Sequence, residues 1–185
     1  MGNNTTLLYH HLTKPLIVML LLTISSCNSP KSAVLNSDAN LNTIETVCPE
    51  DGKCTVQLFK NKSLEVKTDE FGSVYYQMTD NTQTSVILYQ YKRNVEKGLQ
   101  DAHYTEEIIF EISHSDTSIA LNGLNLQKTK MLFGRLCFCR GQTGYYKVTD
   151  GNLELEQKNN EARFSLHFTI TEVPQIIHSI TASAK

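Results

Sequence analysis

Arg163-Phe164-Ser165-Leu166-His167-Phe168-Thr169-Ile170 alternates polar and apolar residues over its whole length. Successive side chains of a β-strand point to opposite faces, so this pattern predicts a strand with one buried face and one solvated face. Such strands are typical of antiparallel sheets, whose outer face can meet water. This stretch therefore favours an antiparallel β-protein, and we searched the rest of the chain for similar segments.

Eight upstream segments carry related signals. They are residues 55–59, 64–69, 74–78, 85–92, 104–112, 129–140, 145–149 and 153–157. We expect turns at Asn61-Lys62, at 80–82, at Asp150-Gly151 and at Asn159-Asn160, and Asp150-Gly151 is the strongest hairpin signal among them. Residues 114–127 are expected to form a loop with one short helical turn, and the tail through Ile180 an edge strand or a frayed end. About nine short strands with little helix predict an antiparallel β-sandwich, or alternatively a β-barrel.

The N-terminus carries an export signal. The apolar run at 16–22 is too short to span a bilayer as a helix, and small polar residues follow it. Its end, Ile24-Ser25-Ser26-Cys27, resembles the lipobox of bacterial lipoproteins; the resemblance covers only the first 27 residues. It implies cleavage before Cys27 and attachment of acyl chains such as palmitate to that cysteine. There are two alternatives. In an ordinary cleaved signal peptide Cys27 would have no role, and N-myristoylation at Gly2 would not explain the apolar run.

The chain thus divides into a lipoprotein signal peptide (1–26), a flexible tether (27–46) and a single β-rich globular domain (47–185). The tether is rich in Ser, Asn and Ala, and about 20 flexible residues reach roughly 25 Å. No acidic cluster directly follows Cys27. By analogy with lipoprotein sorting, this favours an outer-membrane anchor facing the periplasm, with the membrane bound through lipid on Cys27.

Composition narrows the function classes. The formal net charge of −2 argues against a nucleic-acid partner, which calls for a basic face. No phosphate-binding loop, zinc-protease helix or nucleophile elbow occurs. We therefore expect no cofactor and no metal, and a protein that is more readily explained as a binding module than as an enzyme. An enzyme with a dispersed pair of carboxylates stays open, but Glu106, Glu107 and Glu111 are interpreted as the solvated side of a strand.

Four cysteines remain after Cys27: Cys48, Cys54, Cys137 and Cys139. An even number in an exported domain predicts disulfides, paired either locally or across the two clusters. Cys137 and Cys139 would point to one face of a regular strand, so a bridge between them needs a bend. The alternative is a metal-binding or thiol-redox lipoprotein that uses all four sulfurs.

Six tyrosines lie in the predicted strands and could form a binding face for a glycan or an envelope protein. They are Tyr75, Tyr76, Tyr89, Tyr91, Tyr145 and Tyr146. Half-buried packing within the sheet would explain them equally well. The sequence as a whole predicts a membrane-anchored envelope lipoprotein that serves as a non-catalytic binding or interaction module.

Overall fold

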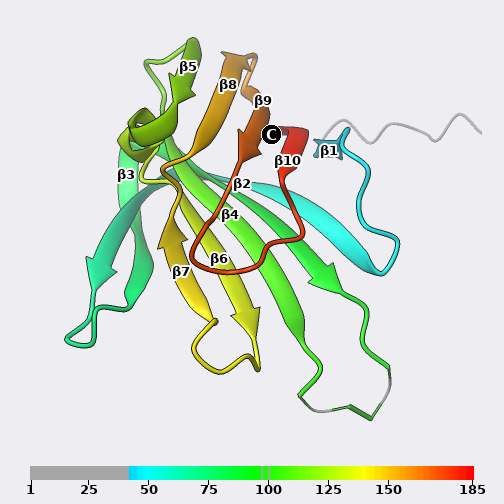
Figure 1. Cartoon of the computed structure of the whole chain (residues 1–185). Coiled ribbons are helices and arrows are strands. Elements are labelled where there is room, and N and C mark those ends of the chain that lie inside the picture. The colour runs from blue at the N-terminus through cyan, green and yellow to red at the C-terminus, as the bar shows by residue number, and fades with distance from the viewer. Residues whose placement is uncertain (1–41, 97, 100) are drawn as a thin grey trace, which may run out of the picture. The chain divides into compact units, whose positions relative to one another are not determined.

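The computed structural model describes residues 42–96, 98–99 and 101–185 (Figure 1). The predicted signal peptide, the proposed lipidation site Cys27 and the first part of the tether lie outside these residues. Within them the chain forms ten strands and one short 3-10 helix, arranged in two antiparallel sheets. The predicted all-β, antiparallel fold class is confirmed. No helix in the described part of the chain is both long enough and apolar enough to span a membrane.

The first sheet has the strand order β1-β10-β9-β8-β5. Its strands are β1 (Thr43–Ile44), β5 (Ser118–Asn122), β8 (Gly151–Lys158), β9 (Glu161–Phe168) and β10 (Ser179–Ala184). β10 lies between β9 and β1 rather than at an edge, because Thr43 and Ile44 pair with Ser183 and Ala182. The folded part therefore begins before residue 47, inside the segment expected to be tether.

The second sheet has the strand order β2-β3-β4-β6-β7. Its strands are β2 (Gly52–Thr68), β3 (Val74–Arg93), β4 (Tyr104–Ser113), β6 (Leu132–Cys137) and β7 (Gly144–Lys147). An additional pairing of Val74 with Tyr145 joins β3 to β7. This contact closes β3, β4, β6 and β7 into a small four-stranded barrel, so features of both predicted architectures are present.

β2 and β3 are each one long bent strand, where the sequence predicted two short strands separated by a turn. The register shifts between Lys60 and Lys62, and Asn61 between them adopts a left-handed backbone with φ of 57°. An extra residue of this kind is a β-bulge, which bends a strand without ending it. The predicted turn at Asn61-Lys62 was therefore wrong, because pairing with β3 resumes on its far side.

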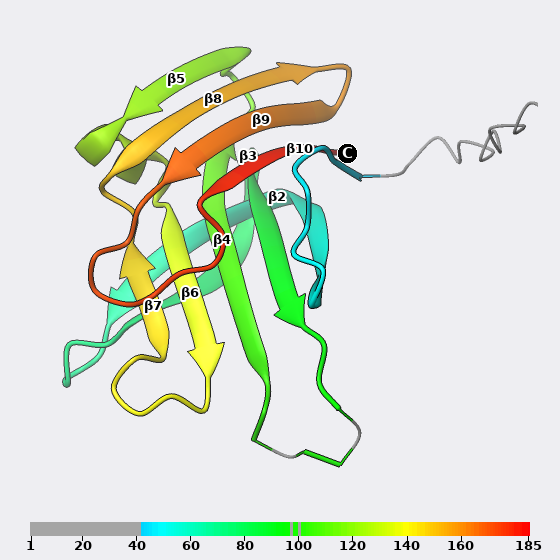
Figure 2. The same cartoon turned by 45° about the vertical axis from the view of Figure 1, so that its right-hand side comes forward.

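The main core lies between the two sheets, whose strands cross in Figure 2. β9 points its alternate apolar side chains into this core, each at most 1% exposed (Phe164, Leu166 and Phe168), so the alternation predicted for this stretch is confirmed. Phe110 of β4 and Phe133 of β6 meet them from the second sheet. The ring centroids are 5.3 Å apart for Phe110–Phe164 and 5.9 Å apart for Phe133–Phe168.

A smaller core fills the other face of the second sheet, where the bent ends of β2 and β3 fold over it. Its fully buried members are Leu64, Val86, Ile109 and Leu132. β4 therefore has apolar neighbours on both faces, with Ile108 and Phe110 in the main core and Ile109 in the smaller one. This arrangement removes the solvated face that the sequence assigned to β4.

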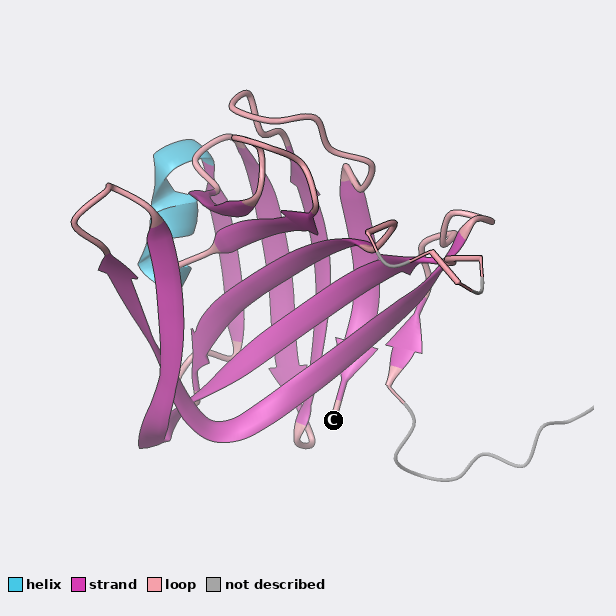
Figure 3. Cartoon of the chain, turned by 90° about the horizontal axis from the view of Figure 1, so that it is seen from below, coloured by secondary structure: helices cyan, strands magenta, loops and turns pink. Residues whose placement is uncertain are grey.

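The segment between β4 and β6 holds the one helix of the described residues, η1 (Gly123–Thr129), drawn in cyan in Figure 3. The expected short helical turn is thus present. Strand β5, which pairs with β8 from Ser118 to Asn122, was missed because its apolar spacing did not distinguish strand from loop. Leu126 of η1 is fully buried in the main core and fixes the helix to the sheets.

Candidate functional site

The six tyrosines of the predicted binding face do not share one surface. Tyr89 and Tyr91 are 2% and 0% exposed in the main core, and Tyr146 packs half-buried against it. Tyr76 and Tyr145 pack in the smaller core, with ring centroids 5.1 Å apart. Only Tyr75 is exposed among them, at 39%. The alternative explanation, packing within the sheets, describes five of the six.

The cysteines form two local disulfides. Cys48 pairs with Cys54 across the turn before β2, with Cα atoms 5.8 Å apart. Cys137 pairs with Cys139, with Cα atoms 5.2 Å apart. The second bridge fits because β6 ends at Cys137 and the chain then turns, with the Gln142 amide donating to the Cys139 carbonyl at 3.0 Å. The described residues contain no cluster of three or more potential metal ligands.

Glu106 is 1% exposed, so the expected solvated position was wrong. Its carboxylate accepts hydrogen bonds from the Tyr104 hydroxyl (2.5 Å) and from the backbone N–H groups of Ile176 (2.7 Å) and Ile177 (2.8 Å). Burial and the hydrogen bond to Glu106 raise the pKa of Tyr104 to about 12. Glu106 therefore fastens the β9–β10 loop to the second sheet and has a structural role.

The other two carboxylates of β4 are also internally bonded. Glu107, 7% exposed, accepts hydrogen bonds from Gln90 and from the Tyr145 hydroxyl, both at 2.8 Å. Burial and the nearby Glu107 charge raise the pKa of Tyr145 well above its usual value. Since each carboxylate is held by fixed donors, neither Glu106 nor Glu107 is placed to act on a ligand.

Glu111 forms an ion pair with Lys130, whose Nζ lies 2.8 Å from its carboxylate. Ser63 Oγ and the Leu64 amide donate to the same carboxylate oxygen at 2.7 Å. Burial alone would raise the pKa of Glu111. The hydrogen bonds and the Lys130 charge together lower it by more, so the pKa of Glu111 lies below its ordinary value. This group braces β2 against β4.

A cleft of about 460 Å³ opens between the two sheets beside the β8–β9 hairpin, and this size suits a small ligand. One wall comes from the second sheet and its flanking loop: Leu58, Lys60, Asn61, Ser85 and His114. The other wall is the β8–β9 hairpin, residues 157–162. Asn159 and Asn160 both adopt positive φ (53° and 63°), as a tight two-residue hairpin turn requires.

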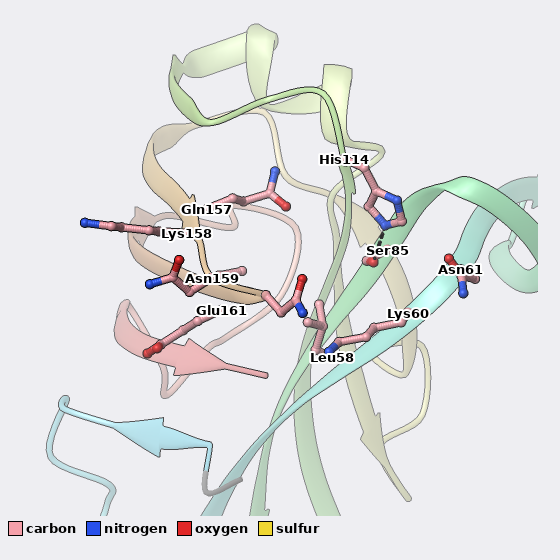
Figure 4. A pocket seen from close by; sticks show the side chains of 11 residues that line it. Leu58, Lys60, Asn61, Ser85, His114, Gln157, Lys158, Asn159 and Glu161 are labelled. Atoms are coloured by element: carbon pink, nitrogen blue, oxygen red, sulfur yellow. Dashed lines mark hydrogen bonds between the residues drawn. The ribbon is translucent and has the colours of Figure 1, made fainter. Parts of the chain in front are cut away.

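Figure 4 shows how the side chains of the cleft lie. Lys60 extends toward the hairpin, whereas Lys158 and Glu161 project away from the space between the walls. Glu161 is paired with Lys185 at 3.5 Å. Among the described residues no carboxylate lies within ion-pair distance of Lys60, so this ammonium group faces the cleft with its charge uncompensated.

Ser85 Oγ and His114 Nε2 share a hydrogen bond of 2.7 Å on the second-sheet wall. Ser85 is only 3% exposed, so its hydroxyl is poorly placed for nucleophilic attack. The pair instead presents an exposed imidazole held in one orientation. On the hairpin side, Gln157 Nε2 donates to the backbone oxygens of Ser113 and Asp116, which fixes the amide and leaves its side-chain oxygen as an acceptor.

The cleft residues were not identified from the sequence. Lys60, Ser85, His114 and Gln157 come from three strands and a loop, and no local motif joins them. Only the Asn159-Asn160 turn was predicted. No protein-family model, no curated protein and no solved structure matches this chain.

Proposed function

We propose that the protein is a lipid-anchored lipoprotein of the bacterial cell envelope, and that it binds a small polar ligand in the cleft. The observation that carries the binding proposal is the Lys60 ammonium group, which faces a polar cleft without an acidic partner among the described residues. The anchor proposal rests on the Ile24-Ser25-Ser26-Cys27 motif.

The chemistry of the cleft favours a ligand that carries one carboxylate and several hydroxyl or amide groups. Lys60 supplies a positive charge and His114 a ring nitrogen, while Asn61 and Gln157 offer amide groups on opposite walls. Leu58 adds a small apolar surface. Acidic saccharide fragments of the cell wall have this composition, and we propose them as the ligand class.

Isothermal titration of the detergent-solubilised full chain with muramyl dipeptide tests the ligand class, with the neutral disaccharide chitobiose as the comparison. Lys60→Met should weaken binding by about 10- to 100-fold, since one charge-assisted hydrogen bond contributes about 1.5–3 kcal/mol and each 1.4 kcal/mol is a factor of ten. Lys158→Met is the matched control, because Lys158 lines the same cleft but projects away from it. Equal weakening by the two variants, tighter binding of chitobiose, or no binding of the dipeptide would contradict the proposal.

The anchor is tested separately by labelling a bacterial expression host with an alkyne analogue of palmitate. The wild-type chain and a Ser26→Ala variant should carry the label, because alanine preserves the small residue before the cleavage point. Cys27→Ser should lose the label and leave the membrane fraction. A labelled Cys27→Ser variant would overturn the anchor without affecting the cleft.

The alternative function, a metal-binding or thiol-redox lipoprotein, needs free thiols at some stage. Thiolates, not disulfides, bind metals and attack other sulfurs. Two disulfides hold Cys48, Cys54, Cys137 and Cys139 in this structure. One of the two bridges has features that support a redox role, and they are independent of the cleft.

A further inference from the structure

We propose that the Cys137–Cys139 disulfide is a thiol–disulfide exchange site that accepts electrons from a protein dithiol, while Cys48–Cys54 is a structural bridge. The proposal depends on the position of the bridge at the end of β6, on the packing of Cys137 against the main core and on the bonds that hold its loop.

The bridge is accessible because β6 loses its outer neighbour before the first cysteine. β7 pairs with β6 only from Leu132 to Arg135. The residue between the two cysteines, Phe138, is 82% exposed. Cys137 packs against the main core, whereas Cys139 lies beyond the end of the strand. Both cysteines are half-buried, and because only Cys137 packs against the main core, we assign Cys139 as the sulfur that an incoming thiolate attacks.

The leaving sulfur, Cys137, lies beside a group of two cations and two carboxylates. Cys137 pairs across the sheet with Tyr104, whose ring is flanked by two guanidinium groups. The Cζ atoms of Arg93 and Arg135 lie 4.6 Å and 5.3 Å from its centroid. Asp51 forms an ion pair with Arg93 at 3.1 Å, and the Glu106 carboxylate accepts a hydrogen bond from the Tyr104 hydroxyl. The positive and negative charges near Cys137 therefore balance.

The complete reaction balances with one dithiol. The first donor thiolate bonds to Cys139 Sγ, the Cys139–Cys137 bond breaks, and Cys137 leaves as a thiolate. The second donor thiolate then attacks its own sulfur in the mixed disulfide and releases Cys139. The donor becomes a disulfide, and the protein gains two electrons and two protons as a pair of thiols.

The loop around the bridge is held by other bonds, so the reduced form can keep the same fold. Thr143 Oγ1 donates to the Arg135 carbonyl (3.1 Å), and Arg135 Nη1 donates to the Gln142 carbonyl (3.0 Å). The bridge encloses a single intervening residue and therefore constrains little of the unfolded chain. By contrast, Cys54 lies inside β2 opposite the buried Tyr91, and both Cys48 and Cys54 pack against the main core.

The test is a redox titration of the detergent-solubilised full chain. The protein is equilibrated in glutathione buffers, quenched with a maleimide and mapped by peptide mass. Cys137–Cys139 should open in a buffer whose ratio of reduced to oxidised glutathione is about 100-fold lower than the ratio that opens Cys48–Cys54. This difference lies within the range that separates labile from structural disulfides. Circular dichroism should be unchanged at that point. Simultaneous opening of both bridges, opening only on unfolding, no opening, or free thiols before reduction would each overturn the proposal.

Single-cysteine variants test which sulfur is attacked. With oxidised glutathione, the free Cys139 of Cys137→Ser should form a mixed disulfide about tenfold faster than the free Cys137 of Cys139→Ser, because Cys137 packs against the main core and Cys139 lies beyond the end of β6. The reverse order would contradict the mechanism.

Discussion

Glu106→Gln tests the most consequential difference between the sequence interpretation and the structure. The carboxylate is 1% exposed and accepts three hydrogen bonds, two of them from the backbone amides of Ile176 and Ile177. Glutamine keeps the shape but replaces one acceptor oxygen by an NH₂ group. In either amide orientation, one of the donors facing Glu106 then meets another donor.

The expected cost follows from these contacts. A hydrogen bond to a charged group contributes about 1.5–3 kcal/mol, and an unsatisfied buried donor costs about 1–3 kcal/mol. Relief from burying a charge offsets part of this sum, so we expect the free energy of unfolding to fall by about 3 kcal/mol. Since such domains unfold with about 5–15 kcal/mol, the variant should still fold at room temperature.

Urea unfolding at neutral pH measures this loss, and hydrogen exchange locates it. The amides of Ile176 and Ile177 should lose protection well before those of the strands, because Glu106 is their acceptor. Glu154→Gln is the control, since Glu154 is exposed on the outer face of β8 and should change stability by less than about 0.5 kcal/mol. A change as small as this in Glu106→Gln, or unchanged exchange at both isoleucines, would refute the reasoning.

Three further changes probe the core and the titrating groups. Phe110→Ala should lower the unfolding free energy by about 4 kcal/mol in urea, since the ring is fully buried; a loss under about 2 kcal/mol would show that the site collapses. Lys130→Met should destabilise the protein most above pH 4.5, which is the ordinary pKa of a glutamate side chain. The lowered pKa of Glu111 contributes stability that is present above this pH and disappears as the pH falls. A loss of stability that is independent of pH would contradict this. Stability should also fall as pH rises from 10.0 to about 12, because burial raises the pKa of Tyr89 and Tyr104 to about 12 while unfolded tyrosines ionise near 10.0. The loss should be about 2–3 kcal/mol per tyrosine. An absorbance titration in which all tyrosines of the folded protein ionise near 10.0 would refute this prediction.

Local pattern was informative where a segment has one buried face. The alternation in β9 predicted its buried residues, and Asn159-Asn160 predicted the β8–β9 hairpin turn. The hairpin predicted at Asp150-Gly151 was wrong, because β7 pairs within the second sheet and β8 within the first, so this turn connects the two sheets. Period-two alternation works in β9 because the other face is open to solvent. In β4 both faces are covered, so the rule that polar residues point to water placed Glu106 and Glu107 in solvent when both are buried with partners.

The cleft illustrates a different limit. Ser85 and His114 are 29 positions apart in the sequence and share a hydrogen bond only because β3 and the end of β4 are neighbours. Gln157 joins them from the opposite sheet. A single sequence contains no local signal for such a set, because the residues meet only after two sheets have formed and packed.

By itself, the sequence determined the antiparallel β class, the β8–β9 hairpin turn and the four cysteines that form disulfides. These depend on short-range chemistry: alternation, turn residues and composition. Only the tertiary structure decided that the disulfides are local, that β3, β4, β6 and β7 close into a small barrel and that Lys60 faces a cleft. Each of these depends on which strands pair over long separations, and pairing is set by the burial of both sheets against each other rather than by any one segment.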